Sequence, residues 1–172
     1  MSISISKILK STVNQSFTAF SSILAKAKAH AAAEGKSEDD FLNARLTDDM
    51  HPMIWQVQMI SEFAVRGANR LAGMTTEEME NWPFEETSFD ELIARLKKAM
   101  ELVNAVDDAA IDAGQSKTIT LPIGPEQSID LSGEDYLLRM FLPNLQFHMT
   151  TAYALLRKDG VEIGKLDFLG GA

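Results

Sequence analysis

The chain has 172 residues and no cysteine, and its 25 acidic and 16 basic residues give a formal net charge of −9 at pH 7. This length suits one domain over residues 1–172 with its own core, while the lack of cysteine excludes disulfides, thiolate metal sites and cysteine nucleophiles. The negative charge disfavours nucleic acid as a partner, and the absence of a signal-peptide pattern or a run of about 20 apolar residues favours a soluble, cytoplasmic protein without a membrane partner.

The first predicted element is a long helix. Apolar residues recur at intervals of three and four over residues 5–33, the spacing of one helical face. Gly35 follows as a stop, and Ser37 with Asp40 is typical of a capping box that opens a short helical turn. Residues 43–51 are expected to form a loop.

A second helix is predicted after Pro52, a residue that suits the first turn of a helix. Its apolar stripe covers residues 53–71 and ends before Gly73, and residues 74–87 form a long acidic connection. Three small residues in the stripe predict tight packing against a neighbouring helix: Ala64, Gly67 and Ala68.

The third helix is expected over residues 89–103, opened by a capping box at Ser88 and Glu91 and ended by residues 107–114. The period then changes to two, which predicts a β-hairpin over residues 117–131. Because an isolated hairpin is marginally stable, it should lie against the helices, and Pro122 places its strand at an edge.

The fourth helix begins at a cap formed by Ser132 and Asp135, and its apolar face covers residues 137–155. Pro143 predicts a kink near residues 140–141, and the tail after residue 160 is expected to lie on the surface. Together the segments predict an all-α fold, an up-down four-helix bundle with a small β-hairpin between the third and fourth helices.

Three histidines are the only imidazoles available to a metal. His148 lies on the apolar face of the fourth helix, so it points into the bundle either as a metal ligand or as a buried neutral histidine with one hydrogen bond. His51 precedes the second helix, on the side of Trp55 and Gln58; the alternative is that Asp48 and Asp49 beside it act through the helix dipole and N-cap. His30 has a structural role.

Strong catalytic signatures are missing. Leu145 stands where a Glu-x-x-His motif ending at His148 would need glutamate, and there is no His-Glu-x-x-His, Gly-x-Ser-x-Gly or phosphate-binding glycine loop. Whether the protein is an enzyme therefore stays open, and no catalytic residue is predicted.

Several short motifs, spread over nearly the whole chain, resemble a branch of the DinB/YfiT-like superfamily that is found in bacteria and fungi and has no known function. The resemblance implies a four-helix bundle, often dimeric, which in many members holds a divalent metal with one histidine from the second helix and two, spaced by four, on the last long helix. Some members are metal-dependent thiol transferases or hydrolases. The motifs are Asn43-Ala-Arg-Leu46, Asp49-Met-His-Pro52, Trp55-Gln-Val-Gln58, Arg70-Leu-Ala-Gly73, Asn144-Leu-Gln-Phe-His148, Thr150-Thr-Ala-Tyr-Ala154 and Leu166-Asp-Phe-Leu-Gly170.

This resemblance implies an incomplete metal site. His148 matches the first histidine of the pair, but Ala152 stands four residues later, and Gln58 and Met59 occupy the region of the second-helix histidine. The metal candidates are therefore His51 and His148, holding zinc or nickel with help from Asp48, Asp49 or Gln58. Trp55, Gln58 and Asn144, which flank these histidines, are the candidate ligand-pocket residues.

Two functional hypotheses follow. The first is a small-molecule or protein-binding module with a degenerate metal site and no firm cofactor. The alternative is a divalent-metal-dependent transferase or hydrolase that uses His51 and His148 to activate a water. A homodimer is also predicted, because Trp55, Met59 and Phe63 form a second apolar stripe on the second helix; such a stripe could equally pack on a neighbouring helix of the same chain.

Overall fold

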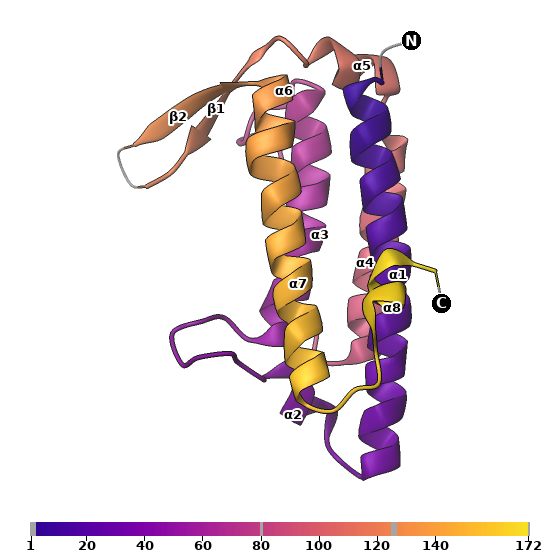
Figure 1. Ribbon diagram of the computed structural model, residues 1–172. Helices are drawn as coiled ribbons and strands as arrows, with labels where there is room; N and C mark the ends of the chain where they lie inside the picture. Colours follow the sequence, from indigo (N-terminus) through magenta and orange to yellow (C-terminus); the bar gives the residue numbers. More distant parts are fainter. Residues whose placement is uncertain (1–2, 80, 125–126, 172) are drawn as a thin grey trace.

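The computed structural model describes residues 3–79, 81–124 and 127–171. Four long helical segments form a bundle, and a two-stranded antiparallel hairpin precedes the last of them (Figure 1), as the sequence predicts. The long segments are α1 (Ile5–Glu34), α3 (Met53–Leu71), α4 (Phe89–Ala105) and a π-helical turn η1 (Tyr136–Phe141) that continues directly into α7 (Leu142–Lys158). The shorter elements are α2 (Glu38–Leu42), α5 (Asp108–Ala113), β1 (Thr118–Pro122), β2 (Ser128–Ser132), α6 (Gly133–Asp135) and α8 (Lys165–Leu169).

Local capping chemistry sets the helix boundaries. Gly35 ends α1 with a left-handed φ of 63°, and Ser37 with Asp40 forms the full capping box of α2. The Ser88 hydroxyl accepts from the backbone N–H of Glu91, while the Glu91 carboxylate accepts from the N–H of Thr87. The predicted starts of these helices are confirmed.

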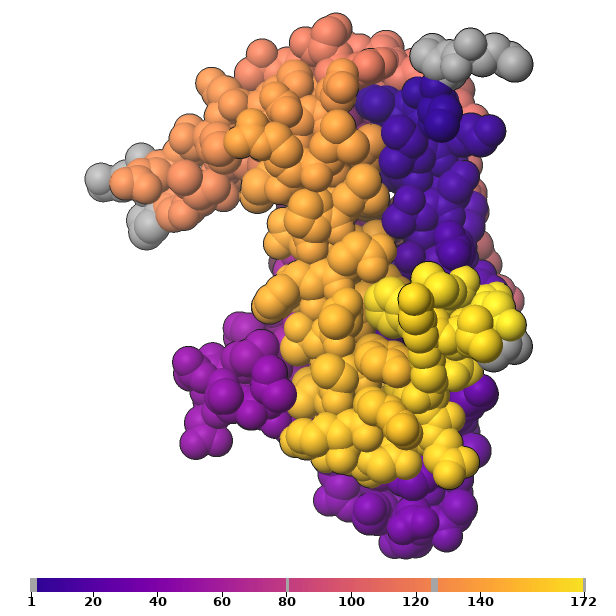
Figure 2. Space-filling model, in the orientation of Figure 1, coloured from indigo at the N-terminus to yellow at the C-terminus, as the bar shows by residue number. Residues whose placement is uncertain are grey.

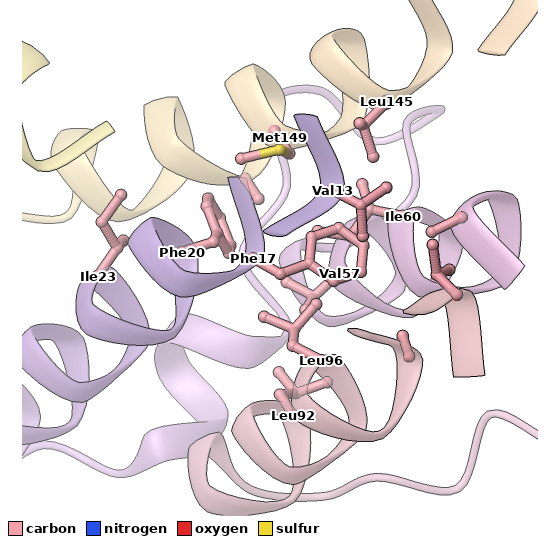
Figure 3. Close-up of a cluster of buried hydrophobic side chains, with 14 of the residues drawn as sticks. Val13, Phe17, Phe20, Ile23, Val57, Ile60, Leu92, Leu96, Leu145 and Met149 are labelled. Carbon is pink, nitrogen blue, oxygen red and sulfur yellow. The ribbon is translucent and has the colours of Figure 1, made fainter. Parts of the chain in front are cut away.

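One apolar interior joins the four long helices. Side chains from all of them meet in Figure 3, which labels residues of α1 (Val13, Phe17, Phe20, Ile23), α3 (Val57, Ile60), α4 (Leu92, Leu96) and α7 (Leu145, Met149). All ten are essentially inaccessible to solvent. Burial of this much apolar surface is the main force that closes the bundle.

Successive long helices run in opposite directions, as in an up-down bundle, except for α3 and α4. The Phe89 N–H donates to the Glu38 carboxylate, so α4 begins at the α2 end of the bundle, and Lys10 Nζ donates to the Val106 carbonyl at the other end of α4. Since α3 also begins at the α2 end, α3 and α4 run parallel. The connection over residues 72–88 is long enough to return along α3, whose 19 residues span about 28 Å.

Three local expectations need correction. Residues 108–113 form a separate helix, α5, after α4 has ended at Ala105. The expected kink at residues 140–141 takes the form of η1, where the Leu142 N–H donates to the Leu137 carbonyl five residues back. The tail does more than lie on the surface, because Val161 and Ile163 are buried and α8 packs against α1.

The hairpin projects from the bundle at the α5 end (Figure 1), although one of its faces is buried. Ile119, Leu121 and Leu131 join the core, whereas Ile123 near the tip is 55% exposed. The molecule is hollowed beneath this hairpin, beside α7 (Figure 2). In the described parts of the chain, no helix is long and apolar enough to cross a membrane.

Candidate functional site

His148 of α7 faces the first turn of α3 and is only 8% exposed. Its Nδ1 lies 2.7 Å from Oε1 of Gln56, and Nε2 of Gln56 donates to the backbone carbonyl of His51 at 3.0 Å. Because the side-chain NH2 of Gln56 donates to that carbonyl, the side-chain oxygen of Gln56 faces the imidazole. We therefore assign the imidazole proton to Nδ1, which donates to this oxygen.

Aromatic rings surround the His148 imidazole. The ring of Phe63 is stacked with it at a centroid distance of 5.7 Å, and Trp55 and Phe147 meet it edge-on at 5.5 and 5.2 Å. Burial, followed by repulsion from His51, lowers the pKa of His148 to about 4. The imidazole is therefore neutral at pH 7, as expected for a buried histidine satisfied by one hydrogen bond.

His51 is exposed and stacks on Trp55, with 3.8 Å between the ring centroids. The structure thus brings His51, Trp55 and His148 together. The expected capping role of Asp48 and Asp49 is wrong, because Pro52 is the N-cap of α3 and no side chain caps that helix. Asp49 instead accepts from the Thr47 hydroxyl, which lowers the pKa of its carboxyl.

The donor set fits a divalent metal poorly. With Nδ1 bonded to Gln56, His148 could offer only Nε2 to a metal, and His51 is the one other imidazole near it. Over the described ranges, no three His, Asp or Glu side chains are grouped so that they could hold an ion. A stable protein site for zinc usually has at least three such ligands.

Gln58, the other candidate on α3 besides Trp55, belongs to a different cluster. Its Nε2 donates to Glu86 at 3.0 Å, and the same carboxylate accepts from Arg95 at 2.7 Å. Arg95 is buried and ties the connection before α4 to both α3 and α4. Its other contacts are Ser61 Oγ at 2.6 Å, the Pro83 carbonyl at 2.7 Å, and the rings of Trp82 and Phe84 at 4.1 and 4.9 Å.

Arg95 was not singled out from the sequence, although a signal was present. It occupies a position between Leu92, Leu96 and Ala99, all on the buried face of α4. A charged residue within such an apolar stripe is unfavourable unless it has buried polar or charged partners, so its position predicts an internal ion pair. Its partner Glu86 lies in the connection, whose path the sequence does not reveal.

A cavity of about 470 Å³ lies between α3, η1, the start of α7 and the hairpin. Asn144 lines it and donates from Nδ2 to the Met140 carbonyl. Phe63 belongs both to this wall and to the surroundings of His148, so the two regions adjoin. The apolar wall consists of Met59, Phe63, Phe84, Leu121, Pro122, Ile123, Met140 and Phe141.

Few polar groups reach this cavity. Arg66 is paired with Glu62 one turn before it on α3. Tyr136 is buried, and desolvation raises the pKa of its hydroxyl, while the charge of Arg70 acts in the opposite direction. An apolar wall with a few polar groups is the usual composition of a small-molecule pocket.

Residues 7–169 match the family described as Domain of unknown function (DUF1993). The chain belongs to the DUF1993 family. A similar solved structure is that of a DinB family member protein from Shewanella denitrificans, 31% identical, with a TM-score of 0.85 over 95% of this chain and 90% of that one. The DUF1993 chain is thus a DinB-like bundle, as its motifs predict. No curated protein matches it.

In this DinB-like bundle, Ala152 departs from the three-histidine metal-binding pattern that the superfamily resemblance implies. It lies four residues after His148 and is fully buried against the core. A methyl group cannot ligate a metal, and a core position leaves little room for another donor. In this DUF1993 member the candidate region thus consists of an imidazole fixed by Gln56 beside an apolar cavity.

Proposed function

We propose that this DUF1993 chain is a small-molecule-binding module in which the metal site of its superfamily has degenerated. The observation that supports it is the cavity of about 470 Å³ beneath the hairpin, lined mainly by apolar side chains. This volume falls within the range of roughly 300–1,000 Å³ that is usual for ligand pockets.

The polar groups at the cavity favour a ligand over a simple packing defect. The cavity has five polar lining residues and is otherwise apolar, so a bound molecule would be oriented by a few directional contacts; the polar residues are Glu62, Arg66, Arg70, Tyr136 and Asn144. His148 lies next to this space and acts as a neutral hydrogen-bonded spacer between α3 and α7. No metal-dependent step is part of the proposal.

A neutral apolar dye tests the cavity. N-phenyl-1-naphthylamine should fluoresce when it binds to the protein, and Met140→Trp, which places a larger side chain in the cavity wall, should weaken binding about tenfold. Leu138→Trp is the matched control, because Leu138 also lies in η1 but is exposed and outside the cavity lining. Equal binding by the two variants would place the dye elsewhere and contradict the proposal.

Elemental analysis of the same purified protein separates this proposal from the metal-dependent transferase or hydrolase. The module is expected to carry far less than one equivalent of zinc or nickel. One equivalent that is retained after mild purification and lost in His148→Ala would favour the metal-dependent alternative through His51 and His148.

A further inference from the structure

Two cavities meet beneath the hairpin, and Arg70 of α3 lines both of them. The first is the apolar cavity described above. The second, of about 590 Å³, lies between the end of α3, residues 73–77 and the strands of the hairpin. Lys117 lines it, together with the hydroxyl-bearing residues Thr75, Thr76, Thr118, Thr120 and Ser128.

The residues that line the two cavities include three cations, Arg66, Arg70 and Lys117, and two acids, Glu62 and Glu77. Arg66 is neutralised by Glu62, but in the described part of the chain neither Arg70 nor Lys117 has a carboxylate within ion-pair distance. The Arg70 guanidinium lies 3.5 Å from the Thr76 hydroxyl and also interacts with the hydroxyl of Tyr136. Glu77 is the acid in the lining of the second cavity.

The position of Arg70 is specific. Its charge acts on the hydroxyl of Tyr136, which is buried at the wall of the first cavity, so the guanidinium lies where the apolar wall ends and the hydroxyl-lined space begins. Arg70 lines both cavities and Lys117 lines the second, and these two cations contrast with a chain whose net charge is −9. Such a site favours a ligand with one negative group at the end of an apolar body.

We infer that the two cavities together bind an amphipathic carboxylate, with its apolar chain against Phe63, Met140 and Phe141 and its carboxylate at Arg70 and Lys117. This inference rests on the proposed small-molecule function and adds the class of ligand. The planar guanidinium suits a carboxylate because it can donate two parallel hydrogen bonds, and Lys117 adds a second positive charge.

Decanoate and decan-1-ol form a matched pair of probes, since both carry a ten-carbon chain and only decanoate is charged. Isothermal titration calorimetry on the full chain should show decanoate binding at least about tenfold more tightly than decan-1-ol, the usual effect of a charge-assisted hydrogen bond. Arg70→Gln should bring the two affinities together. Lys117→Gln should reduce the preference by a smaller factor.

Lys97→Gln is the control, because it removes one positive charge from an exposed position of α4; the preference for decanoate should remain. Added salt should weaken decanoate binding to the unmodified protein and leave decan-1-ol unchanged, a readout that needs no variant. Equal binding of both probes to the unmodified protein, or a preference that survives in Arg70→Gln, would overturn the inference. Failure of both probes to bind would instead count against the cavity as a ligand site.

Discussion

His148 combines an inward-facing position on α7 with a neutral, hydrogen-bonded imidazole. Its spacing from Phe141 and Leu155 correctly predicts that it points inward, because all three fall on one face of a helix. In the structure Gln56 holds one nitrogen and aromatic rings cover the imidazole. Such surroundings stabilise the neutral form and penalise the imidazolium.

The pKa of His148 predicts a loss of stability in acid. The pKa is about 4 in the folded protein against 6.5 for an unperturbed histidine, so between these pH values the unfolded state binds more protons and the free energy of unfolding falls as the pH falls. The full effect is about 3 kcal/mol. Urea unfolding from pH 7 to pH 4 should show a steeper loss for the unmodified protein than for His148→Gln.

An NMR titration provides the direct check. One histidine ring resonance, assigned by its disappearance in His148→Gln, should shift with a midpoint near pH 4. A midpoint near the ordinary value of about 6.5 would show that the ring is well solvated in the folded protein.

The candidate residues were predicted with unequal success, for physical reasons. His51 and Trp55 do lie beside His148, because His51 just precedes α3 and stacks on Trp55 in the first turn of that helix. Gln58 lies elsewhere because its partner Glu86 is 28 residues away, in a connection with no regular periodicity. Spacing within a helix predicts neighbours on that helix, but not the side chains that a loop delivers.

At the scale of elements, the contact between α3 and η1 depends on Gly67. A Cβ at this position would overlap the ring of Phe141, so the close approach that the sequence predicts from Ala64, Gly67 and Ala68 is found here. The Tyr136 hydroxyl lies 3.5 Å from the same point. The missing side chain allows the π-helical turn to pack directly on α3.

Gly67→Ala should therefore destabilise the protein, although alanine is the better helix former. Helix propensity favours the substitution by about 1 kcal/mol, whereas overpacking against a buried ring costs about 1–3 kcal/mol, so we expect a net loss. Phe141→Leu should remove much of the penalty in the double variant, since the smaller side chain frees space. Urea unfolding of the four proteins in this cycle gives the coupling energy; additive effects would contradict the contact.

The prediction of elements succeeded where caps and periodicity coincide. The start of α4 follows from Ser88 and Glu91, and the hairpin from alternation over residues 118–123. The short helices α5 and α8 were missed because five or six residues contain too few turns to show a period. The parallel run of α3 and α4 was missed because a long connection permits either direction.

At the scale of the whole molecule, we propose that the protein is a homodimer, as its superfamily resemblance implies. The stripe of Trp55, Met59 and Phe63 is only partly available for this, since Trp55 and Phe63 pack on His148 and Met59 lines the cavity. Phe147 of α7, which is 56% exposed beside that cluster, extends the same apolar surface outward.

Light scattering tests this assembly. The unmodified protein should have twice the chain mass of 19.0 kDa, and Phe147→Glu should reduce it toward that of one chain, because a buried unpaired charge is strongly unfavourable at an interface. Leu166→Glu, at an exposed position of α8, is the control. A monomeric unmodified protein would rule out the dimer, and an unchanged mass of Phe147→Glu would place the interface on another face.

The turn η1 holds one residue more than a regular α-helix would place in the same rotation, because its hydrogen bonds reach five residues back instead of four. Deleting one residue from Tyr136–Phe141 would let the segment relax into a regular α-helix, and every later side chain would keep its direction. Deleting one residue from the regular part of α7 before His148 would instead rotate each later side chain by about 100° around the axis. His148 would then turn away from Gln56, and Ala152 and Leu155 would leave the interior together. The π-helical turn is therefore a place where relatives can differ in length by one residue and still present the same inward-facing set along their last helix.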